Sequence, residues 1–162
     1  MDYHTHLSKF IEKAATVDYY LTGLILHRFF PDFKQSQNQL SEEFLDFFVR
    51  DRENGITFGR KITLFTKIAV KNYADSYKSY PHLSKSILKS INNHRNTLAH
   101  SFVDTNASKD AIKKKEFILI SFTPDENNVR KNLPFDKCKD MEKTIQETIN
   151  EMARFYKTNG II

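Results

Sequence analysis

The sequence has little of several residue types that would mark a specialised class of protein. One cysteine, Cys138, occurs among 162 residues, so an intramolecular disulfide is excluded and a cysteine-based metal site is not expected. Tryptophan is absent, and four glycines and four prolines are too few for a collagen-like or low-complexity chain. No apolar run approaches the ~18 residues of a membrane span, and the first residues lack the basic-then-apolar layout of a secretory signal. We therefore expect a cytoplasmic protein with no membrane partner.

The residues that are abundant indicate an ordinary globular domain. Hydrophobic residues make up 40% of the chain and charged residues 28%, which excludes intrinsic disorder. Fourteen phenylalanines and seven tyrosines predict a core rich in aromatic rings. The length suits a single domain over residues 1–162. The net charge of +5 is compatible with a polyanionic partner.

Apolar residues recur every three or four positions over most of the chain, which is typical of amphipathic helices. The expected helices run from about Leu7 to Phe29, after Ser41, after Thr57, from about His82 to Phe102, and from Pro134 or Asp136 to Asn159. Between the last two, the run Glu116–Phe122 is rich in β-branched and aromatic residues and predicts a strand, with 128–130 as its partner. We expect an all-α bundle of about five helices, with a small β insertion between the fourth and last helices.

The fourth expected helix ends in Arg95-Asn96-Thr97-Leu98-Ala99-His100. This hexapeptide combines an anion-binding guanidinium, an amide and a group that transfers protons, which are the parts needed to act on a phosphodiester. With an advance of about 100° per residue, Ile87, Ile91, Leu98 and Phe102 form the stripe expected to be buried. Arg95 lies at the edge of that stripe, whereas Asn96 and His100 lie on the opposite face. A solvated polar face without chemistry is the competing interpretation.

Arg-Asn, four residues and then His near the end of an amphipathic helix resembles the signature of the HEPN superfamily (higher eukaryotes and prokaryotes nucleotide-binding domain). Residues 57–62 also look like the entry to the helix before the signature in some members. The resemblance implies a HEPN-like helical bundle and a metal-independent RNA endonuclease. It assigns Arg95 to the scissile phosphate, Asn96 to positioning and His100 to proton transfer. It implies neither a cofactor nor a metal.

The resemblance also implies partners. HEPN-like proteins pair their signature helices across a two-fold axis, so we expect a homodimer whose shared cleft binds RNA. Many act as toxins or antiviral defence effectors, which makes an antitoxin or another regulatory protein a candidate partner. The alternative is a non-catalytic HEPN-like module that dimerises or binds a partner protein or a nucleotide. A helical protein that matches the signature by chance is a third hypothesis.

Other chemically active residues favour structural roles. His4, His6 and His27 suggest a metal site, but the first two fall in a terminus expected to fray, and no carboxylate is placed with them. His94 falls on the buried side of its helix and is expected to pack. Cys138 is expected to be structural. The three lysines at 113–115 are expected to be a solvated charge run. The alternative is that they touch the phosphate backbone near the cleft.

Overall fold

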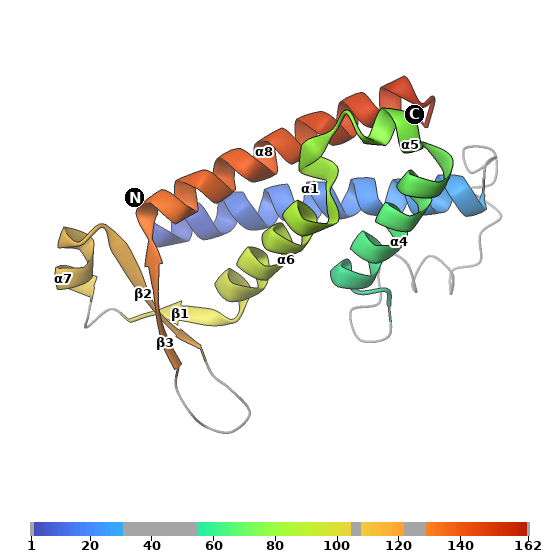
Figure 1. The fold of residues 1–162 in the computed structure, drawn as a ribbon. Coiled ribbons are helices and arrows are strands. Elements are labelled where there is room, and N and C mark those ends of the chain that lie inside the picture. The colour runs from blue at the N-terminus through green and yellow to red at the C-terminus, as the bar shows by residue number, and fades with distance from the viewer. Residues whose placement is uncertain (1, 31–54, 105–107, 122–128, 162) are drawn as a thin grey trace.

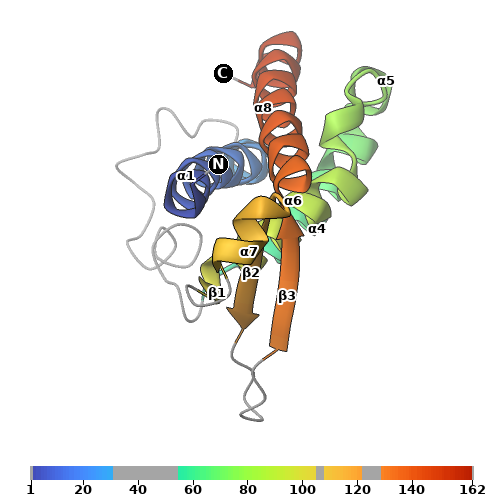
Figure 2. The same cartoon turned by 90° about the vertical axis from the view of Figure 1, so that its left-hand side faces the viewer.

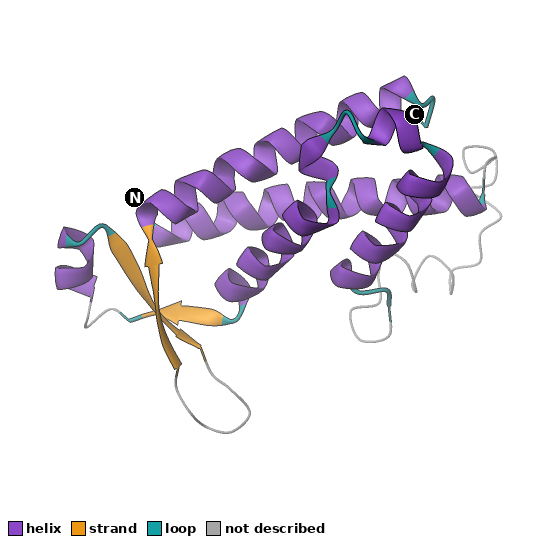
Figure 3. Cartoon of the chain, viewed as in Figure 1, coloured by secondary structure: helices purple, strands orange, loops and turns teal. Residues whose placement is uncertain are grey.

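The computed structural model describes residues 2–30, 55–104, 108–121 and 129–161. Most of these residues are helical and the rest include one three-stranded sheet (Figure 1 and Figure 3), which agrees with the predicted mainly helical class. The elements in chain order are α1 (Tyr3–Phe29), α4 (Phe58–Asn72), α5 (Ala74–Tyr77), η2 (Pro81–Leu83), α6 (Lys85–Ala99), β1 (Ser101–Val103), α7 (Ser108–Lys113), β2 (Glu116–Ser121), β3 (Val129–Pro134) and α8 (Phe135–Thr158). The helix expected after Ser41 lies outside the described residues.

The two longest helices, α1 and α8, run parallel and side by side (Figure 1). Two contacts join these helices. His6 lies against Glu142, and the Tyr156 hydroxyl donates a hydrogen bond to the carbonyl of Tyr20. Both pairs are separated by 136 residues, so the helices keep the same register over about four turns. Burial of the phenol raises the pKa of Tyr156 well above its usual value, as expected for a neutral donor inside the core.

The helices α4 and α6 pack against this pair and close the core. Leucine and isoleucine are the commonest residues in the interior, whereas the composition had predicted a core built largely on phenylalanine, and phenylalanine rings pack among them. The largest side chains that are almost wholly buried are Phe10, Phe65, Phe155, Leu21, Leu24, Ile25, Ile62, Leu83, Leu88, Ile91, Leu98 and Leu119. None of the described helices combines the length and the hydropathy needed to cross a membrane.

The sheet lies below the end of the bundle where α1 begins (Figure 2). Its strands are antiparallel in the order β1-β2-β3, with Ser101 opposite Ser121 and Phe117 opposite Leu133. The predicted strand at Glu116 and its partner near Val129 are confirmed. The sheet nevertheless extends beyond the expected segment, because β1 follows α6 directly and β3 continues to Pro134. The short helix α7 also lies where only a polar loop was expected.

The first helix begins four residues earlier than its apolar periodicity indicated. The Asp2 carboxylate accepts a hydrogen bond from the Thr5 amide at 2.7 Å, which caps the helix and lowers the pKa of Asp2. Tyr3 is buried, and its hydroxyl donates to the carbonyls of Leu98 and Ser101 at 3.3 and 3.4 Å. The expectation of a frayed terminus was therefore wrong. The start of α1 is ordered by contacts with the end of α6.

Two other helix ends, the start of α4 and the end of α8, follow the predicted signals. Thr57 caps α4 by accepting from the Arg60 amide at 3.3 Å. The last helix ends at Thr158, and Gly160 then adopts φ 64°, a left-handed conformation that glycine enters without steric cost.

Candidate functional site

The signature residues lie together at the C-terminal end of α6. The helix ends at Ala99, three residues before the predicted boundary, and His100 follows as its C-cap with its amide bonded to the Asn96 carbonyl at 3.0 Å. The chain then enters β1, so the helical phase no longer applies to Phe102. That side chain was expected to be buried but is 66% exposed. The remainder of the expected stripe is confirmed for Ile91 and Leu98.

Arg95 and Asn96 form a side-chain pair. The Arg95 Nη1 atom donates a hydrogen bond to Asn96 Oδ1 at 3.0 Å, and both residues are half-buried. An asparagine oxygen accepts without adding charge. The guanidinium is therefore oriented while it keeps its charge for an anion.

His100 is exposed, as predicted. Within the described part of the chain its imidazole makes no hydrogen bond, whereas its amide is held by Asn96. The structure therefore places the three predicted residues on one helix end, with Asn96 bonded to both of the others. A guanidinium can bind a phosphate and an accessible imidazole can move a proton, so this helix end carries the residue types that such chemistry needs.

A polar stripe on α6 leads from this helix end to a basic cavity. Lys85, Lys89, Asn92 and Asn96 are spaced by four, three and four residues, which places them on one face. At the far end of the stripe, Lys85 borders a cavity of about 440 Å³. The cavity is lined by Thr63, Thr66, Lys67, Val70, Lys71 and Lys85. The rise from Lys85 to Asn96 is about 16 Å, and the two asparagines of the stripe are half-buried.

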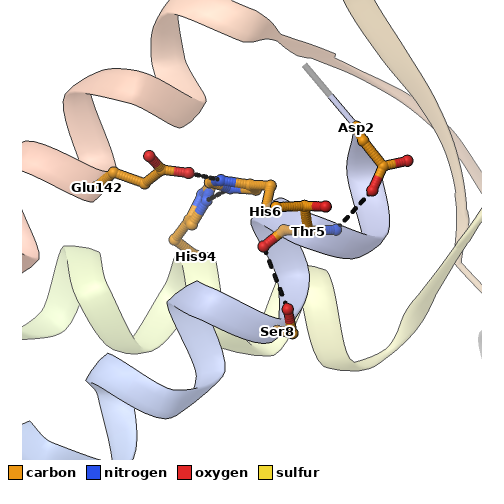
Figure 4. A network of polar contacts seen from close by, with 6 residues as sticks. All are labelled: Asp2, Thr5, His6, Ser8, His94 and Glu142. Carbon is orange, nitrogen blue, oxygen red and sulfur yellow. Dashed lines mark hydrogen bonds and ion pairs between the residues drawn. The ribbon is translucent and has the colours of Figure 1, made fainter.

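A second polar cluster was missed from the sequence (Figure 4). The His6 Nδ1 atom lies 2.5 Å from Glu142 Oε1, and its Nε2 atom lies 3.1 Å from His94 Nε2. Cys138 joins them, because one ligand atom from each of His6, His94 and Cys138 lies within 4.8 Å of the other two. These three residues are 1%, 6% and 0% exposed. The prediction that no carboxylate accompanies His6 was wrong.

Burial sets the protonation of this cluster. Desolvation, followed by the neighbouring charge of His6, lowers the pKa of His94 to about 4. Desolvation, followed by the Glu142 carboxylate, raises the pKa of the Cys138 thiol to about 11. His94 is thus a neutral imidazole near pH 7. It is buried, as predicted, but it also bonds to another imidazole.

The other chemically active residues lie as the sequence indicated. Lys113, Lys114 and Lys115 are exposed, in agreement with a solvated run. His4 is exposed and His27 half-buried, and neither joins the buried cluster. Comparisons of the chain with protein-family models, with curated proteins and with solved structures find no match.

Proposed function

We propose that the protein is a metal-independent endoribonuclease of the HEPN type, whose active site contains Arg95, Asn96 and His100. The observation that carries this proposal is the Arg95–Asn96 hydrogen bond beside an exposed His100 at one helix end. A bare solvated face would not require the amide oxygen of one polar residue to orient the guanidinium of the next. The basic stripe supports RNA as the substrate, because lysines along a surface bind a phosphate backbone.

The chemistry needs no protein nucleophile. A base removes the proton of the ribose 2′-hydroxyl, and the 2′-oxygen forms a bond to phosphorus. The bond from phosphorus to the 5′-oxygen breaks, and an acid gives its proton to that oxygen. The products are a 2′,3′-cyclic phosphate and a 5′-hydroxyl. Arg95 neutralises the charge that builds on the phosphorane, while the imidazole of His100 transfers protons.

A homodimer completes this site. One chain supplies one His100, whereas the reaction needs both a base and an acid. Since His100 is exposed at the end of α6, two copies related by a two-fold axis can bring two imidazoles and two guanidinium groups to one phosphate. A cytoplasmic toxin or defence effector restrained by an antitoxin is the biological role that we propose for such an enzyme.

The direct test is incubation of the purified protein with end-labelled single-stranded RNA in EDTA. Circular dichroism on the same sample verifies that the chelated protein is folded. We expect cleavage to products that end in a cyclic phosphate, and no cleavage of RNA that carries 2′-deoxy sugars at the cut positions. His100→Ala should lower the rate by about 10²–10⁴, and Arg95→Ala should be comparably severe.

His4→Ala is the matched control, because His4 is an exposed histidine outside the site. Both signature variants should keep wild-type helix content. Neither side chain fills the core, so its removal leaves no cavity of the kind that lowers stability by ~2–5 kcal/mol. Cleavage that requires a divalent metal, or variants with wild-type activity, would refute the mechanism. A protein that never cleaves RNA but binds a partner through Asn96 and His100 would instead be the non-catalytic module.

A further inference from the structure

The buried cluster joins three helices that are far apart in sequence. His6 comes from α1, His94 from α6, and Cys138 and Glu142 from successive turns of α8. His6, His94 and Cys138 are buried, and an imidazole in a core carries a cost unless it is satisfied. Hydrogen bonds satisfy the buried imidazoles of His6 and His94, but they do not explain why Cys138 lies next to them.

We propose that His6, His94 and Cys138 bind a transition-metal ion of the zinc class. Glu142 orients His6 by accepting a hydrogen bond from the ring nitrogen that does not bind the metal. Thiolate and imidazole are the donors that Zn²⁺ prefers. The inference is independent of the proposed endonuclease, whose chemistry uses other residues.

The separation of the two imidazoles fits such an ion. In a tetrahedral zinc site two nitrogens, each ~2.0–2.1 Å from the metal, are about 3.3 Å apart, and the two Nε2 atoms here are 3.1 Å apart. Glu142 accepts a hydrogen bond from the Nδ1–H of His6, which leaves the lone pair of Nε2 directed at His94. In zinc sites, a carboxylate commonly accepts a hydrogen bond from the histidine ring nitrogen that does not bind the metal.

Charge and protonation also fit. The charge of a divalent ion is cancelled by the Cys138 thiolate together with the Glu142 carboxylate, so the loaded core is neutral overall. The thiol of Cys138 must lose its proton to the solvent when the metal binds. Three protein donors leave a fourth position for water.

The expected consequence is a stabilised bundle. The ion ties the start of α1 to α6 and α8. An ion at 100 times its Kd shifts the folding equilibrium about 100-fold, or ~2.7 kcal/mol.

The test uses Co²⁺ as a spectroscopic probe on chelator-treated, reduced wild-type protein. Thiolate bound to Co²⁺ gives a charge-transfer absorption in the near ultraviolet, and Cys138 is the only thiol in the chain. We expect this absorption to saturate at one ion per chain, to disappear when Zn²⁺ is added, and to accompany a higher unfolding temperature. Absence of the thiolate absorption would overturn the proposal without any variant having been made.

Variants separate the buried site from surface binding. Cys138→Ser should lose the charge-transfer absorption, and His6→Asn should lose the stoichiometric ion. Glu142→Gln should weaken the affinity by about 10–100-fold. The control is His4→Asn, which changes an exposed histidine two residues from His6 and should bind as the wild type does. Equal loss in His4→Asn, or none in Cys138→Ser, would show surface binding and refute the site.

The two proposals fail separately. His100→Ala should bind the metal normally but not cleave RNA. Conversely, a wild-type protein that cleaves RNA but shows no Co²⁺–thiolate absorption would refute the metal site and leave the endonuclease intact.

Discussion

Asn96 orients the guanidinium of Arg95, the group that the proposed mechanism places on the phosphate. Its amide oxygen accepts from Arg95 Nη1 at 3.0 Å and adds no charge of its own. We predict that Asn96→Asp lowers kcat/KM for RNA by about 10²–10³, because the new carboxylate pairs with the guanidinium and competes with the substrate. Asn96→Ala should have a smaller effect, since it removes the orienting hydrogen bond but leaves the guanidinium charge. Steady-state cleavage assays compare the two.

An Asn96→Asp variant that cleaves RNA as well as the wild type would contradict this role. Circular dichroism and thermal unfolding provide the control, since Asn96 is half-buried at a helix end and aspartate occupies a similar volume. If Asn96→Asp loses both activity and helix content, comparison with Asn96→Ala separates the effect on cleavage from the effect on folding.

At the residue scale, helical phase predicted the exposure of His100, whereas Asn96, expected on the same outward face, is half-buried. Periodicity places a side chain relative to its own helix only, so His94 was expected to be buried and His100 to be exposed, and both are. His6 and Cys138 gave no such signal. Their proximity to His94 arises from packing between three helices, which no single periodicity encodes.

At the scale of elements, α4 and α6 bring Lys67, Lys71 and Lys85 to one cavity. We predict that Lys67→Glu and Lys85→Glu combined weaken binding of single-stranded RNA and lower the slope of log K against log salt by about 0.7 for each phosphate that the protein no longer neutralises. The physical reason is that fewer counterions are released from the RNA. Binding at several salt concentrations, measured with the inactive His100→Ala protein as the background, gives the slope.

The control for this prediction replaces Lys139 and Lys157 with glutamate. These two lysines are exposed on α8, so the change in net charge is the same. Equal weakening of affinity and equal change of slope in both double variants would mean that the RNA responds to net charge alone and not to the surface between α4 and α6.

The elements themselves were predicted unevenly. Long amphipathic helices such as α4 and α8 were recognised within a few residues, because an apolar stripe over 15 or 24 residues is a strong pattern. The short strand β1 was missed. Its three residues carry no periodicity of their own, and they are extended because β2 offers them backbone hydrogen-bond partners.

At the scale of the whole molecule, the proposed mechanism requires two chains. We predict a particle of about 38 kDa, twice the chain mass of 19.0 kDa, in light scattering at micromolar concentration. Phe102 lies two residues beyond His100 and is 66% exposed. We expect Phe102→Asp to dissociate the dimer, because it places a charge where the two signature ends would meet.

Tyr19→Asp is the matched control, since Tyr19 is an aromatic residue 73% exposed on α1, and this variant should remain dimeric. Mixed dimers test the shared cleft more directly. A mixed dimer of one wild-type chain and one His100→Ala chain keeps a single imidazole, so its rate should fall far below half of the wild-type rate. A monomeric wild type, or mixed dimers that keep half of the wild-type rate, would refute the composite site.

The sequence by itself determined the helical class, the long helices and the identity of the residues at the end of α6, because apolar periodicity and residue chemistry are local properties. Only the tertiary structure decided that α6 stops before His100, that a strand follows it and that Asn96 orients Arg95. It also brought His6, His94, Cys138 and Glu142 together. The register between α1 and α8 controls that meeting, and this register follows from the packing of side chains over the entire core.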